Sequence, residues 1–513
     1  MTNRRLFFYN GLLLTAVGVA VRTVTLLFNA YVSRAVGAEG VGLFTLIGTL
    51  YNFAVTFATS GISLTMTRLV ASSIGEGVED RTGGILRSGI LYALAFGLGT
   101  TAVLFFGAPL FSKYILFDAR TLNSIRILSL SLVPIALTAT FTGYFTGVKR
   151  VRKNAVCQVL SQGFRIVITI VAITRLAPRG VEYACIALSV GATLSEIFCF
   201  LVLLVEMLLE RRGKSPAASG EGEGRAVASV ALPLAFSAYV RSALLTIEHV
   251  LIPKRLRLRS DSASEALSAY GTLHGMALPM ILYPMATLSS FSGLLVPEFA
   301  ESTSAGERGR VARIASEALN TTLTYAVVVA TLIFMFSEEL GYVVYNSHSA
   351  GYYVSMLAPV IPIMYLDHVT DSMLKGIGEQ VYSMWVNITD SLLSVVLVWF
   401  LIPAMGISGY ALVIILMEGY NFTLSVIRLR GRIKFKIRPL QALILPAVFA
   451  AAAAGVTKEL FGLWGAAASP LPLVMKIVFS VCLFIALEIF FGIAFSAIKF
   501  REGAPRVNLL SKK

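Results

Sequence analysis

The stretch 87–111 reads RSGILYALAFGLGTTAVLFFGAPLF, and it contains no charged residue after Arg87. A helix needs about 20 apolar residues to cross the roughly 30 Å hydrocarbon layer of a membrane. The stretch is too long for a barrel strand and lacks the alternation of one. It therefore predicts a membrane-spanning helix.

Similar apolar runs fill the rest of the chain, about fourteen in all. Their predicted extents are 8–33, 41–71, 87–111, 125–147, 154–177, 183–209, 228–253, 266–296, 314–336, 354–376, 381–404, 407–427, 440–462 and 472–498. Polar residues interrupt the second, eighth and tenth runs. The pattern predicts an all-α, polytopic membrane protein.

The composition excludes most soluble classes. Of 513 residues, 56% are hydrophobic and 14% are charged, whereas soluble domains carry about 25% charged residues. A cytosolic enzyme, a secreted disulfide scaffold and a disordered chain are excluded. The net charge of +15 comes from short clusters between apolar runs, not from a basic stripe with aromatics, so we expect no nucleic-acid partner. The four cysteines lie in apolar runs without metal-ligand spacing, and we expect small buried side chains.

The basic clusters predict the orientation. They are Arg4–Arg5, the group from Lys149 to Lys153, Arg211–Lys214, Arg308–Arg313, Arg428–Arg438 and the C-terminal Lys512–Lys513. With the spans above, all fall on one side, which the positive-inside rule makes cytoplasmic together with both termini. The loop Lys254–Arg259 disagrees. It is either a basic patch that meets an anionic headgroup, or a sign that the seventh span is misplaced.

A linker, RRGKSPAASGEGEGRA (211–226), separates two halves that resemble each other weakly. VRTVTLLFNAYVSR from Val21 parallels VRSALLTIEHVLIPKR from Val240, and FTLIG at 44–48 parallels GTLHG at 271–275. We therefore predict an N-terminal six-helix bundle (1–210), a cytoplasmic linker (211–226), a pseudo-symmetric C-terminal bundle (227–430) and two additional helices with a basic tail (431–513). In such repeats the substrate site lies between the halves.

Charged residues within spans point to a polar cavity or to interhelical pairs, because burying a charge in a membrane costs roughly 2.5–3.5 kcal/mol. Arg22 and its repeat counterpart Arg241 lie near mid-depth. Either they pair with acids such as Glu248 or Glu196, or they bind an anionic substrate, for which guanidinium groups suit phosphate. Arg34 and Arg68 lie nearer the span ends, where anchoring at the interface is an equal alternative.

Two polar stripes follow helical spacing. Gln158, Gln162 and Arg165 share a helix face, which predicts a cavity lining whose amides suit sugar hydroxyls. Asp367 and Asp371 share a face with Lys375, so an Asp371–Lys375 bridge is the simple alternative to a functional stripe.

Four carboxylates, namely Glu248, Asp367, Asp371 and Asp390, and the imidazole of His249 are candidates for coupling transport to an ion. Proline residues in the eighth and tenth spans should bend those helices. The sequence contains no phosphate-binding GxxxxGK[ST] motif and no HExxH motif. We therefore expect no cofactor, no metal and no enzymatic activity, and transport driven by a gradient.

The segment VSRAVGAEGVGLFTLIGTLYNFAVTFATSGISLTMTRLVA (32–71) resembles the stage V sporulation protein B family of the multidrug/oligosaccharidyl-lipid/polysaccharide exporter superfamily. LLVPEFAES (294–302) resembles its second-half counterpart. The resemblance implies two six-helix bundles around a cavity, two added helices, and a location in the bacterial cell membrane. It also implies a flippase for an undecaprenyl-linked saccharide, such as a peptidoglycan or spore-cortex precursor.

The related lipid II flippases carry arginines in the first, second and eighth spans. By resemblance Arg22 and Arg34 take the first-span roles, whereas Phe28 stands in place of a further arginine and His274 stands in the eighth span. The implied partners are the undecaprenyl-(pyro)phosphate-linked saccharide, membrane lipids and, for ion coupling, a monovalent cation. A drug/cation antiporter of the same superfamily and a non-transporting scaffold for wall synthesis are the alternatives. The excess of arginine over acid at mid-depth disfavours the antiporter.

Overall fold

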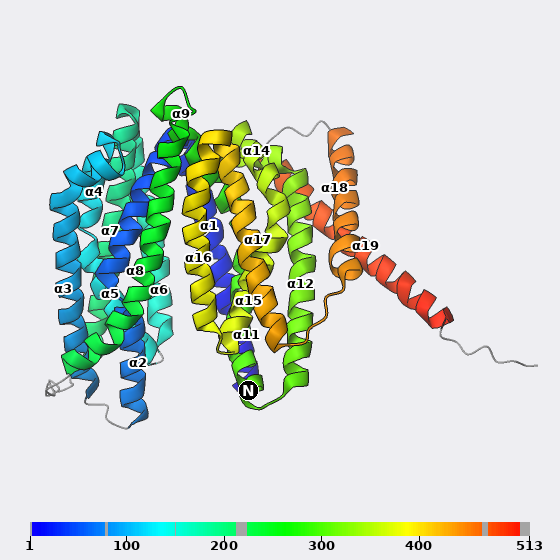
Figure 1. The fold of residues 1–513 in the computed structure, drawn as a ribbon, viewed down its shortest axis with the longest axis horizontal. Coiled ribbons are helices and arrows are strands. Elements are labelled where there is room, and N and C mark those ends of the chain that lie inside the picture. The colour runs from blue at the N-terminus through cyan, green and yellow to red at the C-terminus, as the bar shows by residue number, and fades with distance from the viewer. Residues whose placement is uncertain (1–2, 77–80, 149, 212–222, 464–469, 503–513) are drawn as a thin grey trace, which may run out of the picture. The chain divides into compact units, whose positions relative to one another are not determined.

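The computed structural model describes residues 3–76, 81–148, 150–211, 223–463 and 470–502 (Figure 1). All regular structure within these ranges is helical, as predicted. The chain forms two compact units. Unit 1 comprises Met1–Pro279 and Met384–Met417, and unit 2 comprises Met280–Ser383 and Glu418–Lys513.

Unit 1 is a bundle in which helices distant in sequence pack together. Its helices are α1 (Asn3–Thr59), α2 (Ile62–Gly75), α3 (Arg81–Leu110), η1 (Phe111–Ile115), η2 (Ala119–Thr121), α4 (Leu122–Ser129), α5 (Leu132–Gly147), α6 (Val151–Leu176), η3 (Ala177–Arg179), α7 (Val181–Arg211), α8 (Glu223–Leu256), α9 (Ala263–Tyr270), η4 (Gly271–Ala277), most of α16 (Gln380–Met405) and the start of α17 (Ile407–Arg432). α8 packs against α1, α2 and α3. Residues 212–222 of the predicted linker lie outside the described residues, and the remainder from Glu223 forms the first turn of α8.

Unit 2 contains the remaining helices. They are α11 (Met285–Ser304), α12 (Arg308–Met335), α13 (Ser337–Tyr345), α14 (His348–Leu357), η5 (Ala358–Val360), α15 (Ile361–Gly376), the end of α17, η6 (Leu440–Ile444), α18 (Leu445–Leu463) and α19 (Pro470–Glu502); α10 (Leu278–Leu282) lies across the unit boundary. Here α12 packs against α15 and α18, and α18 packs against α19. The short helix α13 was not predicted.

Ten helices among the described residues are long and apolar enough to cross a membrane, or eleven if the bent pair α4–α5 counts as one span. The predicted number of about fourteen is not confirmed. One reason is that Thr23–Ile74 is a single 52-residue candidate. A straight helix of that length would extend roughly 78 Å at 1.5 Å per residue, more than twice the membrane core, so this candidate combines the first two predicted spans. Another is that the predicted seventh and eighth spans provide no candidate among the described residues.

Local residue chemistry explains where the helices break. Gly37 has φ 77° and lies between the predicted first and second spans, where glycine tolerates a left-handed backbone. Ser60 and Gly61 (φ 42° and 71°) end α1 before α2. The interrupted eighth span breaks at Pro284, and the tenth changes to a 3₁₀ turn around Pro359, as the missing N–H of proline predicts.

The internal repeat is visible in the geometry of each unit. α5 ends at Gly147 and α15 ends at Gly376, and both helices have 16 residues. A Cβ on Gly147 would lie 2.9 Å from Cβ of Val70, and a Cβ on Gly376 would lie 2.7 Å from Cβ of Phe299. Gly376 follows Gly147 by 229 positions in the sequence, and Phe299 follows Val70 by the same 229 positions. The same close helix contact has therefore been built twice.

Further features recur at this offset. Phe117 and Asn346 both have φ 54°, and each precedes an extended residue whose side chain caps the next helix, Asp118 or Ser347. α6 and α16 begin at residues 151 and 380 and each has 26 residues. The buried positions Gly89, Ala93 and Gly97 of α3 likewise have buried counterparts in α12, namely Ala318, Thr322 and Ala326.

The expectation that every cysteine is buried is wrong for one of the four. Cys157, Cys185 and Cys199 are buried, and the Sγ atoms of Cys157 and Cys199 lie 2.8 Å apart as free thiols. Cys482 on α19 is exposed. An apolar sequence cannot distinguish these cases, because a membrane helix also presents apolar side chains to lipid.

Candidate functional site

A cluster of titratable and aromatic side chains occupies the interior of unit 1. We call it the histidine–carboxylate cluster, and it consists of Glu248, His249, Tyr270, His274, Asp390, Ser394 and Tyr410. Its members come from α8, α9, η4, α16 and α17. Only tertiary packing brings these five elements together.

The histidines lie between two buried tyrosines. Tyr270 Oη and His249 Nδ1 are 3.1 Å apart, and Tyr410 Oη and His274 Nδ1 are 3.5 Å apart. The Tyr270 and His274 rings stack with centroids 5.4 Å apart, and the two histidine rings are 4.4 Å apart. His274 lies in the π-helical turn η4, which ends just before Pro279, and a proline removes one backbone donor and favours such a distortion.

Two carboxylates complete the cluster. Ser394 Oγ donates a 2.6 Å hydrogen bond to Oε1 of Glu248, which is 9% exposed. Oδ1 of Asp390 is buried without a hydrogen-bond partner among the described residues. Asp390 interacts electrostatically with Glu248 and Arg241, although Arg241 makes no ion pair within 4 Å in the described part of the chain.

A second polar group forms where α6 faces α7. Arg165 acts electrostatically on Glu196 and on the Tyr51 hydroxyl, again without an ion pair among the described residues. Gln162 Nε2 donates to Thr25 Oγ1 at 3.2 Å, and Gln158 is exposed. The predicted stripe therefore does not act as one surface, because Gln162 is engaged with α1.

The remaining predicted residues lie outside these groups. Arg34 and Arg68 are exposed on α1 and α2. The side chain of Arg22 lies outside the described residues. In unit 2, Asp371 Oδ2 forms a 2.6 Å ion pair with Lys375, which is the structural alternative noted above, and Asp367 is half-buried on α15.

The basic residues that disagreed with the orientation lie at and after the end of α8, which covers the predicted seventh span but is not among the ten candidate membrane helices of the described residues. Lys254 lies 4.3 Å from the Phe117 ring centroid, and Arg255 lies over the Trp399 ring. Arg257 Nη1 donates to Phe117 O at 3.2 Å, and Arg259 donates to Ala404 O. These four basic side chains therefore connect the C-terminal end of α8 to Phe117 and to α16 in unit 1.

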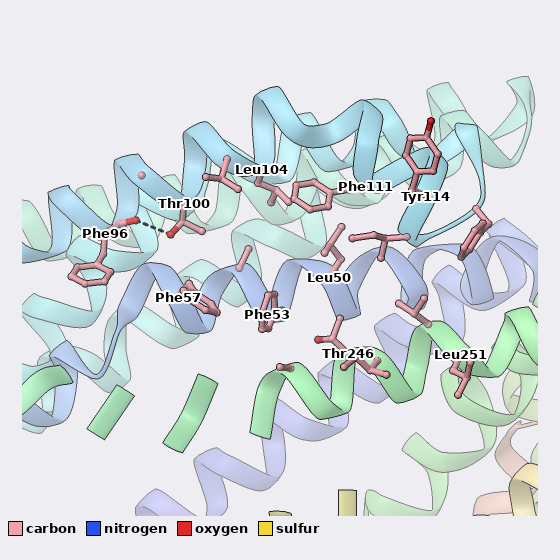
Figure 2. Close-up of a pocket in the computed structure, with 18 of the residues that line it drawn as sticks. Leu50, Phe53, Phe57, Phe96, Thr100, Leu104, Phe111, Tyr114, Thr246 and Leu251 are labelled. Carbon is pink, nitrogen blue, oxygen red and sulfur yellow. Dashed lines mark hydrogen bonds between the residues drawn. The ribbon is translucent and has the colours of Figure 1, made fainter. Parts of the chain in front are cut away.

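Each unit also contains a groove that sequence reasoning missed. The α3 groove in unit 1 has a volume of about 950 Å³ and is lined by α1, α3, η1 and α8 (Figure 2). Phe53 and Phe57 of α1 face Phe96, Leu104 and Phe111 across it. Its lining contains a single charged residue, at Lys254.

The α12 groove in unit 2 has a volume of about 900 Å³ and a different character. Arg313, Lys436 and Arg438 lie at its polar part, and Leu332 and Phe484 contribute to its apolar part. The extended segment before η6 is held by Asn320, whose Nδ2 donates to Lys436 O at 2.9 Å and whose Oδ1 accepts from Arg438 N at 2.8 Å. These bonds fix the backbone of both basic residues at the groove.

The sequence profile of a family described as polysaccharide biosynthesis protein matches residues 7–303, and that of the MatE family matches residues 260–400. The chain is 25% identical over 420 residues to stage V sporulation protein B of Bacillus subtilis, covering 80% of this chain and 81% of that one. It is 23% identical over 405 residues to the lipid II flippase MurJ of the same organism, covering 70% and 73%.

Solved structures share the fold. An inward closed conformation of the lipid II flippase MurJ matches with a TM-score of 0.65 and 13% identity, covering 96% of this chain and 99% of that one. An inward-facing multidrug resistance MATE transporter matches with a TM-score of 0.64 and 13% identity, covering 82% and 98%. The fold is therefore that of these transporters.

Proposed function

The chain belongs to the polysaccharide biosynthesis protein family, and from that premise we propose that it is a flippase. Its substrate is a saccharide linked to undecaprenyl (pyro)phosphate, a precursor of peptidoglycan, spore cortex or another polysaccharide. Transport proceeds by alternating access without covalent chemistry. The names of the relatives, stage V sporulation protein B and lipid II flippase, support this substrate class.

The observation that carries the proposal is the state of two arginines, half-buried Arg165 on α6 and exposed Arg241 on α8. Arg165 and Arg241 each lie within electrostatic range of one carboxylate, and neither forms an ion pair among the described residues. A guanidinium group in this state can bind a phosphate through two parallel hydrogen bonds. The nearby carboxylate would stabilise the charge of the guanidinium group until a phosphate binds.

The α12 groove supports the same substrate class. Its lining carries three basic residues, Arg313, Lys436 and Arg438, against two acidic ones, Glu317 and Glu488, and this positive balance suits a pyrophosphate. Its apolar residues suit a hydrocarbon chain. Groove volumes near 900 Å³ lie within the range of about 300–1,000 Å³ typical of ligand sites.

Energy for transport would come from an ion gradient or from the membrane potential. Glu248 and Asp390 are the best-placed coupling groups, since they interact with each other inside the bundle. Asp371 is a weaker candidate because Lys375 already neutralises it. The protein is a multi-pass protein of the bacterial membrane, and we propose that both termini are cytoplasmic because the basic clusters share that side.

One observation favours a drug/cation antiporter instead. The MatE profile covers Glu248's partners Asp390 and Ser394, and paired carboxylates can bind a cationic drug. The two functions differ in the charge of their cargo, so they respond differently to loss of an arginine.

Reconstitution into proteoliposomes distinguishes them. We expect Arg165→Gln and Arg241→Gln each to reduce translocation of an undecaprenyl-pyrophosphate saccharide about tenfold or more, since each removes a charge-assisted contact. Arg175→Gln, at the exposed C-terminal end of α6, is the matched control. Unchanged translocation in both variants would remove the arginine mechanism, and cation-dependent dye efflux without lipid translocation would favour the antiporter.

A further inference from the structure

The α3 groove accepts only hydrocarbon along most of its length. The hydroxyl of Thr100 donates to Phe96 O at 2.7 Å, which Figure 2 shows as a dashed line. The hydroxyl of Thr246 donates to Ser242 O at 2.8 Å in the same way. Both threonines therefore present methyl groups to the groove. A ligand with polar groups in this section would lose its hydrogen bonds to water without replacing them.

The groove is longer than one membrane leaflet. Its α3 side extends from Ala95 to Ile115, roughly 30 Å at 1.5 Å per residue. The whole hydrocarbon layer is about 30 Å thick, so an acyl chain of a phospholipid reaches only its middle. A polyprenyl chain is long enough to fill the groove.

Positive charge gathers at one end of the groove. Lys254 lines it there, and Arg257 binds the carbonyl of Phe117 close by. This end corresponds to the C-terminal end of α3, near Tyr114 (Figure 2). A phosphate on the end of a hydrocarbon chain complements this arrangement.

The internal repeat relates the two grooves. Ala95, Phe96 and Gly99 line the α3 groove, and the residues 229 positions later, Thr324, Tyr325 and Val328, line the α12 groove. The same helix face thus borders a groove in each unit. The basic groups differ in position. Arg313 belongs to the N-terminal turns of α12, whereas Lys254 belongs to α8 and lies beside the C-terminal end of α3.

We propose that the α3 groove is a second binding site for the phosphorylated polyprenyl lipid, with its tail along α3 and its phosphate at Lys254. The proposal rests on the proposed function, which supplies the lipid class. The sequence predicts about six helices in each half, an even number, so we expect both halves to enter the membrane in the same sense. On that expectation we assign the phosphate to opposite membrane surfaces in the two grooves. The α12 groove then receives the lipid before translocation, and the α3 groove holds it afterwards.

Photolabelling of the full-length protein in nanodiscs tests the tail site. The probe is undecaprenyl phosphate carrying a diazirine near the end of its tail, and labelled peptides are mapped by mass spectrometry. A Cβ on Gly99 would have no atom within 4 Å, so Gly99→Phe fills the groove without displacing its walls. Each excluded CH₂ costs about fourfold in affinity, so we expect labelling of the α3 and α8 peptides to fall roughly tenfold or more.

Gly163→Phe is the matched control, because Gly163 is also exposed in mid-helix with open space at its Cβ, outside the groove. It should retain labelling of α3 and α8. Competition by unlabelled undecaprenyl phosphate, but not by the same excess of phosphatidylglycerol, is expected. Equal competition by phosphatidylglycerol would overturn the proposal, since the groove would then be an ordinary lipid site.

Two further outcomes separate this proposal from the proposed function. Labelling confined to α12 and α19 peptides would overturn the second site and leave the flippase intact. Labelling of neither groove would overturn both.

The phosphate contact has its own test. We expect Lys254→Gln to weaken binding of undecaprenyl phosphate about tenfold, and Lys113→Gln, an exposed lysine at the same end but outside the lining, to leave it unchanged. Unchanged affinity in Lys254→Gln would refute the phosphate position.

Discussion

At the scale of single residues, Glu379 shows how an ion pair outside the spans ties helices together. Its carboxylate accepts a 2.8 Å bond from Arg428 Nη2 and lies 2.6 Å from Arg432 Nε, both on α17. The hydrogen bond from Arg428, followed by the charges of both arginines, lowers the pKa of Glu379 below its usual value of 4.5. A lowered pKa stabilises the fold at pH above 4.5, and this contribution is lost as pH falls through the folded-state pKa.

We therefore expect Glu379→Gln to lower the melting temperature at pH 7 and the difference from the parent protein to shrink as the pH drops below about 4.5. Thermal unfolding of the purified protein in detergent at several pH values measures this. Glu301→Gln, at an exposed site on α11, should match the parent throughout. A difference that persists at low pH would show that the ion pair is not its cause.

At the scale of elements, close helix contacts depend on two glycines that are related by the repeat. A methyl group on Gly147 would meet Val70 and the Thr67 carbonyl at 2.9–3.1 Å, and one on Gly376 would meet Phe299 and the Val296 carbonyl at 2.7–2.9 Å. The helices would have to separate, and overpacking of this kind costs about 1–3 kcal/mol.

Gly147→Ala and Gly376→Ala should therefore each lower the melting temperature of the full chain. Gly163→Ala has open space at its Cβ and should raise it slightly, because alanine favours a helix by up to about 1 kcal/mol over glycine. A similar rise in all three variants would contradict the close contacts.

The elements also show how far sequence patterns reach. Apolar runs predict most helices to within a few residues, and proline predicts the break at Pro284 and the 3₁₀ turn at Pro359, whereas the kink at Gly37 was not predicted. The histidine–carboxylate cluster could be predicted only in part. Glu248, His249, His274 and Asp390 were candidates, whereas Tyr270, Ser394 and Tyr410 were not, because an apolar run does not indicate which buried hydroxyl will contact a carboxylate or a histidine.

At the scale of the whole molecule, the unconfirmed feature is the orientation in the membrane. We expect a cysteine at Ser260, in the loop after α8, to react with a membrane-impermeant maleimide in intact cells. A cysteine at Ser215, in the predicted linker, should react only after permeabilisation. Both are placed in a Cys482→Ser background, since Cys482 is exposed. The reverse labelling pattern would show that the orientation is opposite to the predicted one. The membrane sides assigned to the two grooves would then be exchanged.

The sequence by itself determined the membrane-embedded helical class, the duplication and the family, because hydrophobic length and repeated order are properties of a linear chain. Tertiary structure alone decided the partners of each polar group. It placed Asp371 against Lys375 and opened one groove beside α3 and another beside α12. Within the described ranges it left Arg165 and Arg241 near acids but without an ion pair. These outcomes depend on which faces of distant helices meet, and helical periodicity specifies a face without specifying its partner.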